Sequence, residues 1–213
     1  WEFRSKPAWQ RLIIMVGGVT VNVILGILIY AMVLFTYGEE YLPTKNVSYG
    51  IATDSLSYKI GLRDGDKILS VDHKEVSNIQ KVGYEVLTNK AQSIQVERDG
   101  KKLDLSISED NLSEMIKQKA TLVTPRFPCI VDSLLPNAAA AKVGFMKGDK
   151  IISINGKPTV FFNEVSDYLK KNKYSVANIQ FVRATDTMII RTPVDGDGTI
   201  GFYHKSVNEL FVM

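Results

Sequence analysis

The chain has 213 residues, with 26 Lys and Arg against 23 Asp and Glu, two His, one Cys and 45% apolar residues. This length allows one large domain or two small ones, and a net charge of +3 is too small to indicate a nucleic-acid partner. One Cys excludes an intrachain disulfide and a multi-cysteine zinc site, and the two His are too far apart to form a His-x3-His pair.

The apolar residues concentrate near the N-terminus. From Leu12 to Gly38 the chain runs 27 residues without Asp, Glu, Lys or Arg. As a helix this run is about 40 Å long, against roughly 30 Å for the hydrocarbon core of a bilayer. Signal-peptide cores reach only about 15 residues, and a buried core helix this long rarely lacks a charge. The run predicts a transmembrane helix over residues 12–38, in contact with the lipid bilayer.

The flanking charges predict the direction of this helix. Basic residues precede it and acidic residues follow it, namely Arg4, Lys6 and Arg11 against Glu39 and Glu40. Positively charged flanks stay in the cytoplasm. We therefore expect residues 1–11 to form a cytoplasmic lead-in and the part after Tyr41 to be exported. The first residue is not Met and the last residues turn apolar again, which indicates an internal fragment of a longer membrane protein.

Within the predicted span, Gly18, Asn22 and Gly26 recur every four residues. They form a narrow stripe of small and polar residues on one helix face. Small residues allow another helix to approach closely, and an intramembrane Asn requires a polar partner. Two interpretations remain open: packing in a helical bundle, or an Asn22 that faces a polar site in the membrane. Both require other transmembrane helices.

The exported part contains an internal repeat. Residues 59–74 and 142–157 align at an offset of 83, with eight of sixteen positions identical. The same offset aligns apolar residues spaced i, i+3, i+7 in a helix of each copy. We predict two related domains, over residues 46–108 and 127–195. Between them we expect a linker, 109–126, with a helix over Leu112–Lys119, and after them a strand and the lead-in to a further span, 196–213.

Each copy reads as strand, short helix, strand, longer helix and hairpin. In the first copy we predict the strand at 49–53, the short helix at 57–60, the next strand at 68–72, the longer helix at 79–88 and the hairpin strands at 94–98 and 103–107. In the second copy the same elements are predicted at 129–134, 138–143, 151–155, 162–171, 179–183 and 188–191. Gly61 and Gly144 stand where a helix ends in the left-handed conformation. Asp99-Gly100 is a two-residue hairpin turn.

The pattern Gly61-Leu62-Arg63-Asp64-Gly65-Asp66-Lys67-Ile68, with Gly144-Phe145-Met146-Lys147-Gly148-Asp149-Lys150-Ile151 in the second copy, resembles the PDZ domain in its circularly permuted bacterial form. The resemblance covers about two-thirds of the chain. It implies one transmembrane α-helix followed by two α+β PDZ-like half-open β-barrels. Such barrels bind an extended peptide by adding it as a strand beside the longer helix.

Carried over by position, the resemblance implies peptide-binding residues in both copies. They are Tyr49, Gly50, Ile51 and Ala52 with the helix residues Val82 and Val86, and Cys129 and Ile130 with Val165 and Leu169. The four helix residues have a second interpretation as plain core, because apolar stripes on helices usually pack inward. The thiol of Cys129 opens an apolar strand and is expected to be buried and inert.

A span with Gly18-Val19-Thr20-Val21-Asn22, followed by two PDZ-like units, is similar to the second transmembrane helix and exported domains of the site-2 protease family. The family motif has Pro where this chain has Val19. The resemblance extends to the lead-in and to the bacterial sigma-E-regulator proteases. It implies a multi-pass zinc metalloprotease of the bacterial inner membrane, with the PDZ domains in the periplasm.

The resemblance implies zinc as cofactor, held by a His-Glu-x-x-His and an Asp on other helices. None of these motifs lies in the 213 residues, so we expect no catalytic residue and no metal ligand here, and only Asn22 near the active site. The implied role is substrate gating and peptide binding in the intramembrane cleavage of membrane proteins such as anti-sigma factors. The implied partners are these substrates or their trimmed periplasmic tails. The alternative is a non-enzymatic, membrane-anchored tandem-PDZ adaptor for extended peptides.

Overall fold

The computed structural model describes residues 7–38, 41–118 and 122–211. The chain divides into two compact units, Trp1–Glu40 and Tyr41–Met213. The flanking charges at positions 4, 6, 39 and 40, from which the direction of the span is predicted, lie outside the described residues. That direction stays a prediction.

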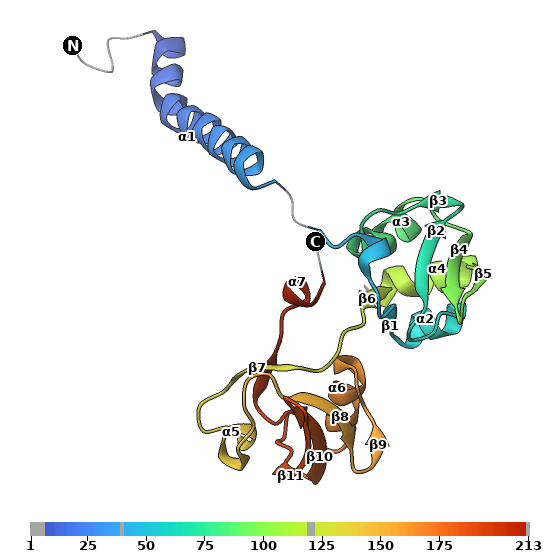
Figure 1. The fold of residues 1–213 in the computed structure, drawn as a ribbon. Helices are drawn as coiled ribbons and strands as arrows, with labels where there is room; N and C mark the ends of the chain where they lie inside the picture. Colours follow the sequence, from blue (N-terminus) through green and yellow to red (C-terminus); the bar gives the residue numbers. More distant parts are fainter. Residues whose placement is uncertain (1–6, 39–40, 119–121, 212–213) are drawn as a thin grey trace. The chain divides into compact units, whose positions relative to one another are not determined.

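The first unit is a single helix, α1 (Ala8–Tyr37) (Figure 1). Its 30 residues begin directly after Pro7, a residue well suited to a helix start, and end before Gly38 at a φ of 67°. At about 1.5 Å per residue α1 is roughly 45 Å long, and no residue of it is buried. By length and composition it is the one described helix able to cross a membrane.

The second unit holds two lobes, each built around its own buried apolar cluster (Figure 1). The first lobe contains, in chain order, η2 (Thr44–Asn46), β1 (Ile51–Thr53), α2 (Ser55–Ile60), β2 (Lys67–Val71), β3 (Lys74–Glu75), η3 (Ile79–Lys81), α3 (Val82–Thr88), β4 (Ser93–Arg98), β5 (Lys101–Ser106), α4 (Glu109–Gln118) and β6 (Val123–Pro125). The second contains β7 (Val131–Leu134), α5 (Ala139–Val143), β8 (Lys150–Ile154), β9 (Lys157–Pro158), α6 (Phe162–Lys171), β10 (Val176–Arg183), β11 (Asp186–Pro193) and β12 (Phe202–His204), followed by α7 (Val207–Leu210).

The two lobes repeat one topology. Each has an antiparallel four-stranded sheet, in the order β3-β2-β4-β5 in the first lobe and β9-β8-β10-β11 in the second. Each also has a two-stranded sheet, β1-β6 and β7-β12. The predicted helices and hairpins are confirmed to within a few residues, and Gly61 and Gly144 end their helices at φ of 101° and 92°. The Asp99-Gly100 turn is confirmed by φ of 51° and 74° between the paired residues Arg98 and Lys101.

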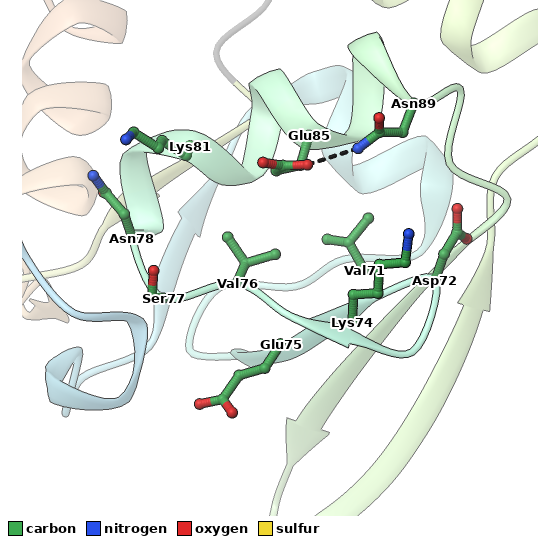
Figure 2. A pocket seen from close by; sticks show the side chains of 10 residues that line it. All are labelled: Val71, Asp72, Lys74, Glu75, Val76, Ser77, Asn78, Lys81, Glu85 and Asn89. Carbon is green, nitrogen blue, oxygen red and sulfur yellow. Dashed lines mark hydrogen bonds between the residues drawn. The ribbon is translucent and has the colours of Figure 1, made fainter.

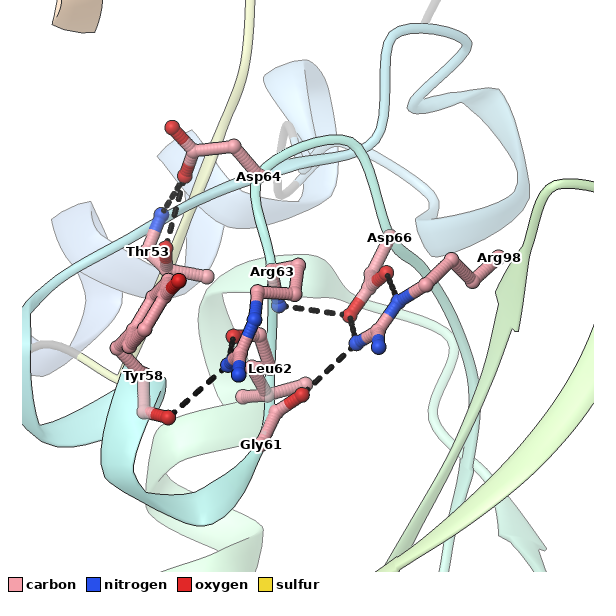
Figure 3. Close-up of polar contacts among 8 residues, drawn as sticks. All are labelled: Thr53, Tyr58, Gly61, Leu62, Arg63, Asp64, Asp66 and Arg98. Atoms are coloured by element: carbon pink, nitrogen blue, oxygen red, sulfur yellow. Dashed lines mark hydrogen bonds and ion pairs between the residues drawn. The ribbon is translucent and has the colours of Figure 1, made fainter.

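The same buried ion pair stands in both lobes. Asp66 is 1% exposed, and its carboxylate accepts hydrogen bonds from Arg98 Nε and Nη2, both at 2.7 Å, and from the Arg63 N–H at 2.8 Å (Figure 3). Arg98 Nη2 also donates to the Gly61 carbonyl at 2.8 Å. The pair therefore ties the end of α2 and the following turn to β4. Asp149 and Arg183 make the corresponding bonds in the second lobe.

The segment expected as a linker packs into the first core. Leu112 and Met115 of α4 are buried with α2 and α3, and Leu122 and Val123 at β6 are buried in the same cluster. The segment after the second hairpin also packs into a core. Ile200 is buried in the second cluster, and Phe202 packs against that cluster. Each lobe thus ends in a returning strand, β6 or β12, which the sequence analysis places outside the two domains.

Candidate functional site

The first predicted peptide-receiving strand, β1, is paired along both edges. The N–H of Ile51 donates to the Asp66 carbonyl at 2.9 Å, and the Ile51 carbonyl accepts from the Gly65 N–H at 2.8 Å. On the other edge β6 pairs antiparallel with β1, with Ala52 opposite Thr124. A strand with both edges taken has no backbone groups left for a peptide. In this structure Ile51 and Ala52 therefore have their backbone groups paired within the chain, and their predicted role as a peptide-receiving strand stays a prediction.

The residues before β1 hold the fold together. Gly50 has a φ of 70°, and a Cβ at this position would overlap the Gly65 backbone. Its carbonyl accepts from the Arg126 N–H at 2.9 Å. The ring of Tyr49 makes edge contacts with Phe161 and Phe211, at centroid distances of 5.8 and 6.0 Å. Tyr49 and Gly50 thus make contacts within the chain, and their predicted peptide-binding role stays a prediction.

The second predicted strand is also occupied. The Cys129 N–H donates to the Val160 carbonyl and its carbonyl accepts from the Ile151 N–H, both at 2.9 Å. The Ile130 carbonyl accepts from the Lys205 N–H at 2.8 Å, and β7 pairs with β12 along its next residues. Cys129 and Ile130 are therefore not open to a peptide strand, for the same reason as in the first lobe.

Cys129 is fully buried, and burial raises the pKa of its thiol to about 12. A rise from 9 to about 12 lowers the thiolate fraction about 1000-fold. We expect the native chain to react with Ellman's reagent at pH 8 at least about 100-fold more slowly than the urea-unfolded chain. Equal rates in the two states would contradict the burial of this thiol.

The four helix residues are buried in the two cores. Val82 and Val86 belong to the first cluster, and Val165 and Leu169 belong to the second. Val165 and Leu169 also line a cavity of about 100 Å³ between α6 and the segment that enters β12. Its lining residues are Phe162, Val165, Ser166, Leu169, Gly198, Thr199, Ile200, Gly201 and Phe202. We call this cavity, with the adjoining side of β12, the second-lobe groove.

Two residues that line this groove, Gly201 and Phe202, have backbone N–H groups whose direction follows from the neighbouring carbonyls. The Ile200 carbonyl accepts from the Ala140 N–H at 2.8 Å, and the Gly201 carbonyl accepts from the Leu135 N–H at 3.1 Å. In a planar trans peptide the C=O of one residue and the N–H of the next point in opposite directions. The N–H groups of Gly201 and Phe202 are thus directed away from α5 and β7. Adjacent N–H groups in this arrangement suit a carboxylate.

Asp195 shapes the loop that leads to these residues. Its carboxylate accepts from the Thr199 N–H and Oγ1, both at 2.7 Å, and from the Asp197 N–H at 3.1 Å. Burial would raise the pKa of Asp195, but the hydrogen bonds from Thr199 and the neighbouring N–H groups outweigh it and lower the pKa. The ionised side chain therefore closes the turn that precedes the groove.

The first lobe has a corresponding arrangement. β6 pairs with β1, as β12 pairs with β7, and the Ser57 hydroxyl donates to the Leu122 carbonyl at the position of the Ala140–Ile200 bond. The Leu122 Cβ lies 3.6 Å from where a Gly83 Cβ would stand on α3. The residues that lead to Leu122, 119–121, lie outside the described part.

Behind each longer helix lies a polar cleft. In the first lobe it has a volume of about 270 Å³, and Figure 2 shows Glu85 of α3 and Asn89, which follows α3, on one side and Val71 and Lys74 on the other. Asn89 Nδ2 donates to Glu85 Oε2 at 2.6 Å. The corresponding cleft of the second lobe is lined by residues at equivalent positions, including Thr159 and Tyr168. Both clefts mix charges of both signs.

Asn22 is exposed on α1, and Cβ atoms added at Gly18 and Gly26 would meet nothing within 4 Å. Among the residues that the structure describes, no three His, Cys, Asp or Glu come together as a metal site. The ring of His204 contacts the rings of Phe127 and Phe162, at centroid distances of 4.9 and 4.2 Å. The described residues therefore do not fit a zinc ion.

Residues 1–190, from the lead-in of α1 to β11, match peptidase family M50. The chain belongs to this family, the site-2 proteases. It is 33% identical over 106 residues to the metalloprotease MmpA of Caulobacter vibrioides, covering 49% of this chain and 26% of that protein. It is 28% identical over 172 residues to the regulator of sigma-E protease RseP of Escherichia coli, covering 73% and 37%. It is also 28% identical over 120 residues to the regulator of sigma-W protease RasP of Bacillus subtilis, covering 55% and 28%.

This M50 chain thus spans 26% to 37% of the length of these three relatives. A solved PDZ domain of the SdrC-like protein of Listeria monocytogenes is similar over 39% of the chain and 90% of its own length, with 26% identity and a TM-score of 0.32. The family match confirms the resemblance to the site-2 proteases that the sequence motifs indicate.

Sequence reasoning missed β6, and it predicted a strand within 196–213, where β12 lies, without assigning that strand to the second lobe. The repeat offset is 83 residues through the helices, but Leu122 and Ile200 are 78 residues apart, because the second lobe has no equivalent of α4. A search for the apolar pairs Leu122-Val123 and Ile200-Gly201-Phe202 after each hairpin, at a free offset, would have found the two strands.

Proposed function

We propose that this chain is the substrate-gating and peptide-binding part of a membrane-embedded M50 metalloprotease that cleaves transmembrane segments in regulated intramembrane proteolysis. α1 spans the bilayer of a bacterial inner membrane, and the two lobes are circularly permuted PDZ domains on its periplasmic side. The zinc site and the catalytic residues stand on other helices of a longer chain. Substrates are membrane proteins or their trimmed periplasmic tails. Family membership and the span of relatives that the chain covers support this proposal over a non-enzymatic adaptor.

The observation that carries the peptide-binding role is the second-lobe groove. Among the described residues β12 pairs with β7 alone. The segment that enters β12 borders an apolar cavity against α6, and the N–H groups of Gly201 and Phe202 are directed away from α5 and β7. An extended peptide would add a strand to β12 and place its C-terminal carboxylate at these N–H groups. Val165 and Leu169 then contact the last apolar side chain of the peptide. The strand that receives the peptide is β12 and not the predicted one at Cys129 and Ile130.

A bulky side chain at Ser166 tests this proposal. Ser166 is half-buried and lines the groove, whereas its neighbour Asp167 is exposed and lines the polar cleft behind the helix. We expect Ser166→Trp to lower the affinity for an eight-residue peptide with a C-terminal valine and a free carboxylate by at least 10-fold, because the indole fills the cavity. Asp167→Trp leaves the affinity unchanged. Calorimetric titration of the full chain in detergent micelles measures both values.

A peptide with an amidated C-terminus provides a second test of the same binding site. An amide cannot accept two charge-assisted hydrogen bonds, so the amidated peptide is expected to bind at least 10-fold more weakly. Equal binding by the two peptides, or by Ser166→Trp and the unmodified chain, would exclude the groove as the site.

The protease role is tested by the flanking reading frame: a His-Glu-x-x-His on an upstream helix supports it, and its absence would contradict it.

A further inference from the structure

The first lobe contacts the segment after β12, where Phe211 is buried in its core cluster, and it also contacts the first turn of α6, which borders the second-lobe groove. Arg126, directly after β6, forms an ion pair with Glu164 and lies 3.6 Å from the centroid of the Phe161 ring. The other carboxylate oxygen of Glu164 accepts from the N–H groups of Val160 and Phe161, at 3.0 and 3.2 Å. The side chain of Arg126 is only 16% exposed and that of Glu164 30%. Arg126 therefore holds the start of α6 against the first lobe.

Two further contacts act on the same turn. Asn163 Nδ2 donates to Asp64 Oδ2 at 3.0 Å, while Asp64 Oδ1 accepts from the N–H and hydroxyl of Thr53, at 2.7 and 2.8 Å, at the end of β1. The ring of Tyr49 contacts Phe161 edge-on. The first lobe thus contacts the start of α6 through the side chains of residues 161, 163 and 164.

A stack of rings joins both sides of the groove to the first lobe. Phe127 stacks on Phe162 at a centroid distance of 5.4 Å and contacts His204 at 4.9 Å, and Phe162 contacts His204 at 4.2 Å. Phe162 begins α6 and lines the groove, and His204 ends β12. Phe127 packs against the core cluster of the first lobe. The ring stack holds α6 and β12 together at the end of the groove nearest the first lobe.

The groove is narrow in this arrangement. The cavity between α6 and the segment that enters β12 has a volume of about 100 Å³. An added strand lies about 4.8 Å from its neighbour and needs room for its side chains on the helix side. We expect a peptide strand that adds to β12 to move α6 away from β12. That movement strains the ring stack and the Arg126–Glu164 pair.

We infer that peptide binding in the second-lobe groove and the contact between the two lobes oppose each other: a peptide that enters the groove releases the first lobe. This inference rests on the proposed peptide-binding function and adds its regulation. By thermodynamic linkage, the factor by which the contact weakens peptide binding equals the factor by which the peptide weakens the contact, so a change that weakens the contact strengthens peptide binding by at most the same factor. The contact between the two lobes would then be intact when the groove is empty and released when a substrate tail occupies the groove.

The test uses Arg126→Ala in the full chain in detergent micelles, with the free-carboxylate peptide ending in valine. We expect the variant to bind the peptide roughly five-fold more tightly, which is the lower end of coupling between two sites. Glu164→Gln, which removes the charge but keeps an oxygen acceptor for the helix start, is expected to change affinity in the same direction. Arg191→Ala, at an exposed arginine of β11, serves as the matched control and leaves affinity unchanged.

A distance measurement separates the outcomes. Spin labels at Lys102→Cys and Thr185→Cys, exposed positions on the two lobes, report the distance between them by double electron–electron resonance. The free-carboxylate peptide is expected to broaden this distance distribution in the otherwise unmodified chain, and Arg126→Ala to broaden it without peptide. Unchanged or weaker peptide binding by Arg126→Ala, with a broadened distribution, would overturn the coupling while leaving the groove as a binding site. Failure of every variant to bind the peptide would overturn the proposed function itself.

Discussion

Gly50→Ala is expected to destabilise the first lobe by roughly 3 kcal/mol or more. Gly50 has a φ of 70°, which costs an L-residue about 1–2 kcal/mol. The added Cβ would also overlap the Gly65 carbonyl and lie 2.8 Å from the Asp66 carbonyl. Both neighbours are backbone atoms, so the loop has to move, and overpacking of this kind costs about 1–3 kcal/mol.

Native-state hydrogen exchange, measured peptide by peptide on the full chain, gives the free energy of unfolding for each lobe. Gly100→Ala is the matched control, because Gly100 has a φ of 74° and nothing within 4 Å of an added Cβ. It should lose only the backbone cost of about 1–2 kcal/mol. A similar loss for the two variants would show that the close approach of Gly50 to Gly65 is absent in solution.

Asp66→Ala is expected to destabilise the first lobe by roughly 2–4 kcal/mol. The substitution leaves the Arg63 N–H without its acceptor and the Arg98 guanidinium without its counter-ion. Removal of one partner from a fully buried pair costs about 3–5 kcal/mol, but Arg98 is 29% exposed and water replaces part of the lost interaction. Protection in the second lobe, which has its own Asp149–Arg183 pair, should persist.

Asp104→Ala is the control for this change. Asp104 lies on β5 and makes one exposed side-chain hydrogen bond, from Gln95 Nε2 at 3.0 Å. Its loss should change the free energy of unfolding by no more than about 0.5 kcal/mol. An equal effect of the Asp66 and Asp104 substitutions would mean that the buried carboxylate does not organise the turn after α2.

Local chemistry in the sequence was sufficient for most of the fold. The span over 12–38 lacks charge, Gly61 and Gly144 require positive φ, and the Gly-Asp turns lead into alternating strands, so α1, the helices and the hairpins could be predicted. Such signals act within a few residues, which is why the element positions agree with the structure. The family could also be recognised, because its motifs combine with the order of the elements.

The candidate site could be predicted only in part. An apolar helix face marks Val165 and Leu169 in the sequence, and both line the groove. The strand opposite them depends on long-range pairing, which local composition does not encode. Leu134 of β7 pairs with Phe202 of β12, and these two residues are 68 positions apart in the chain. The Tyr49-Gly50 sequence resembled a peptide-binding loop. In the structure, position 50 requires glycine because its backbone lies close to the backbone of Gly65.

The most direct test of the account is a chemical-shift titration of the isotope-labelled full chain in detergent micelles with the free-carboxylate peptide ending in valine. If the second-lobe groove is the binding site, the largest changes fall on the amides of 198–204 in and before β12 and of 162–169 in α6. The amides of β1 and β7 change little, because both edges of these strands are paired within the chain. Largest changes at 49–53 or 129–134, or no change at saturating peptide, would contradict the account.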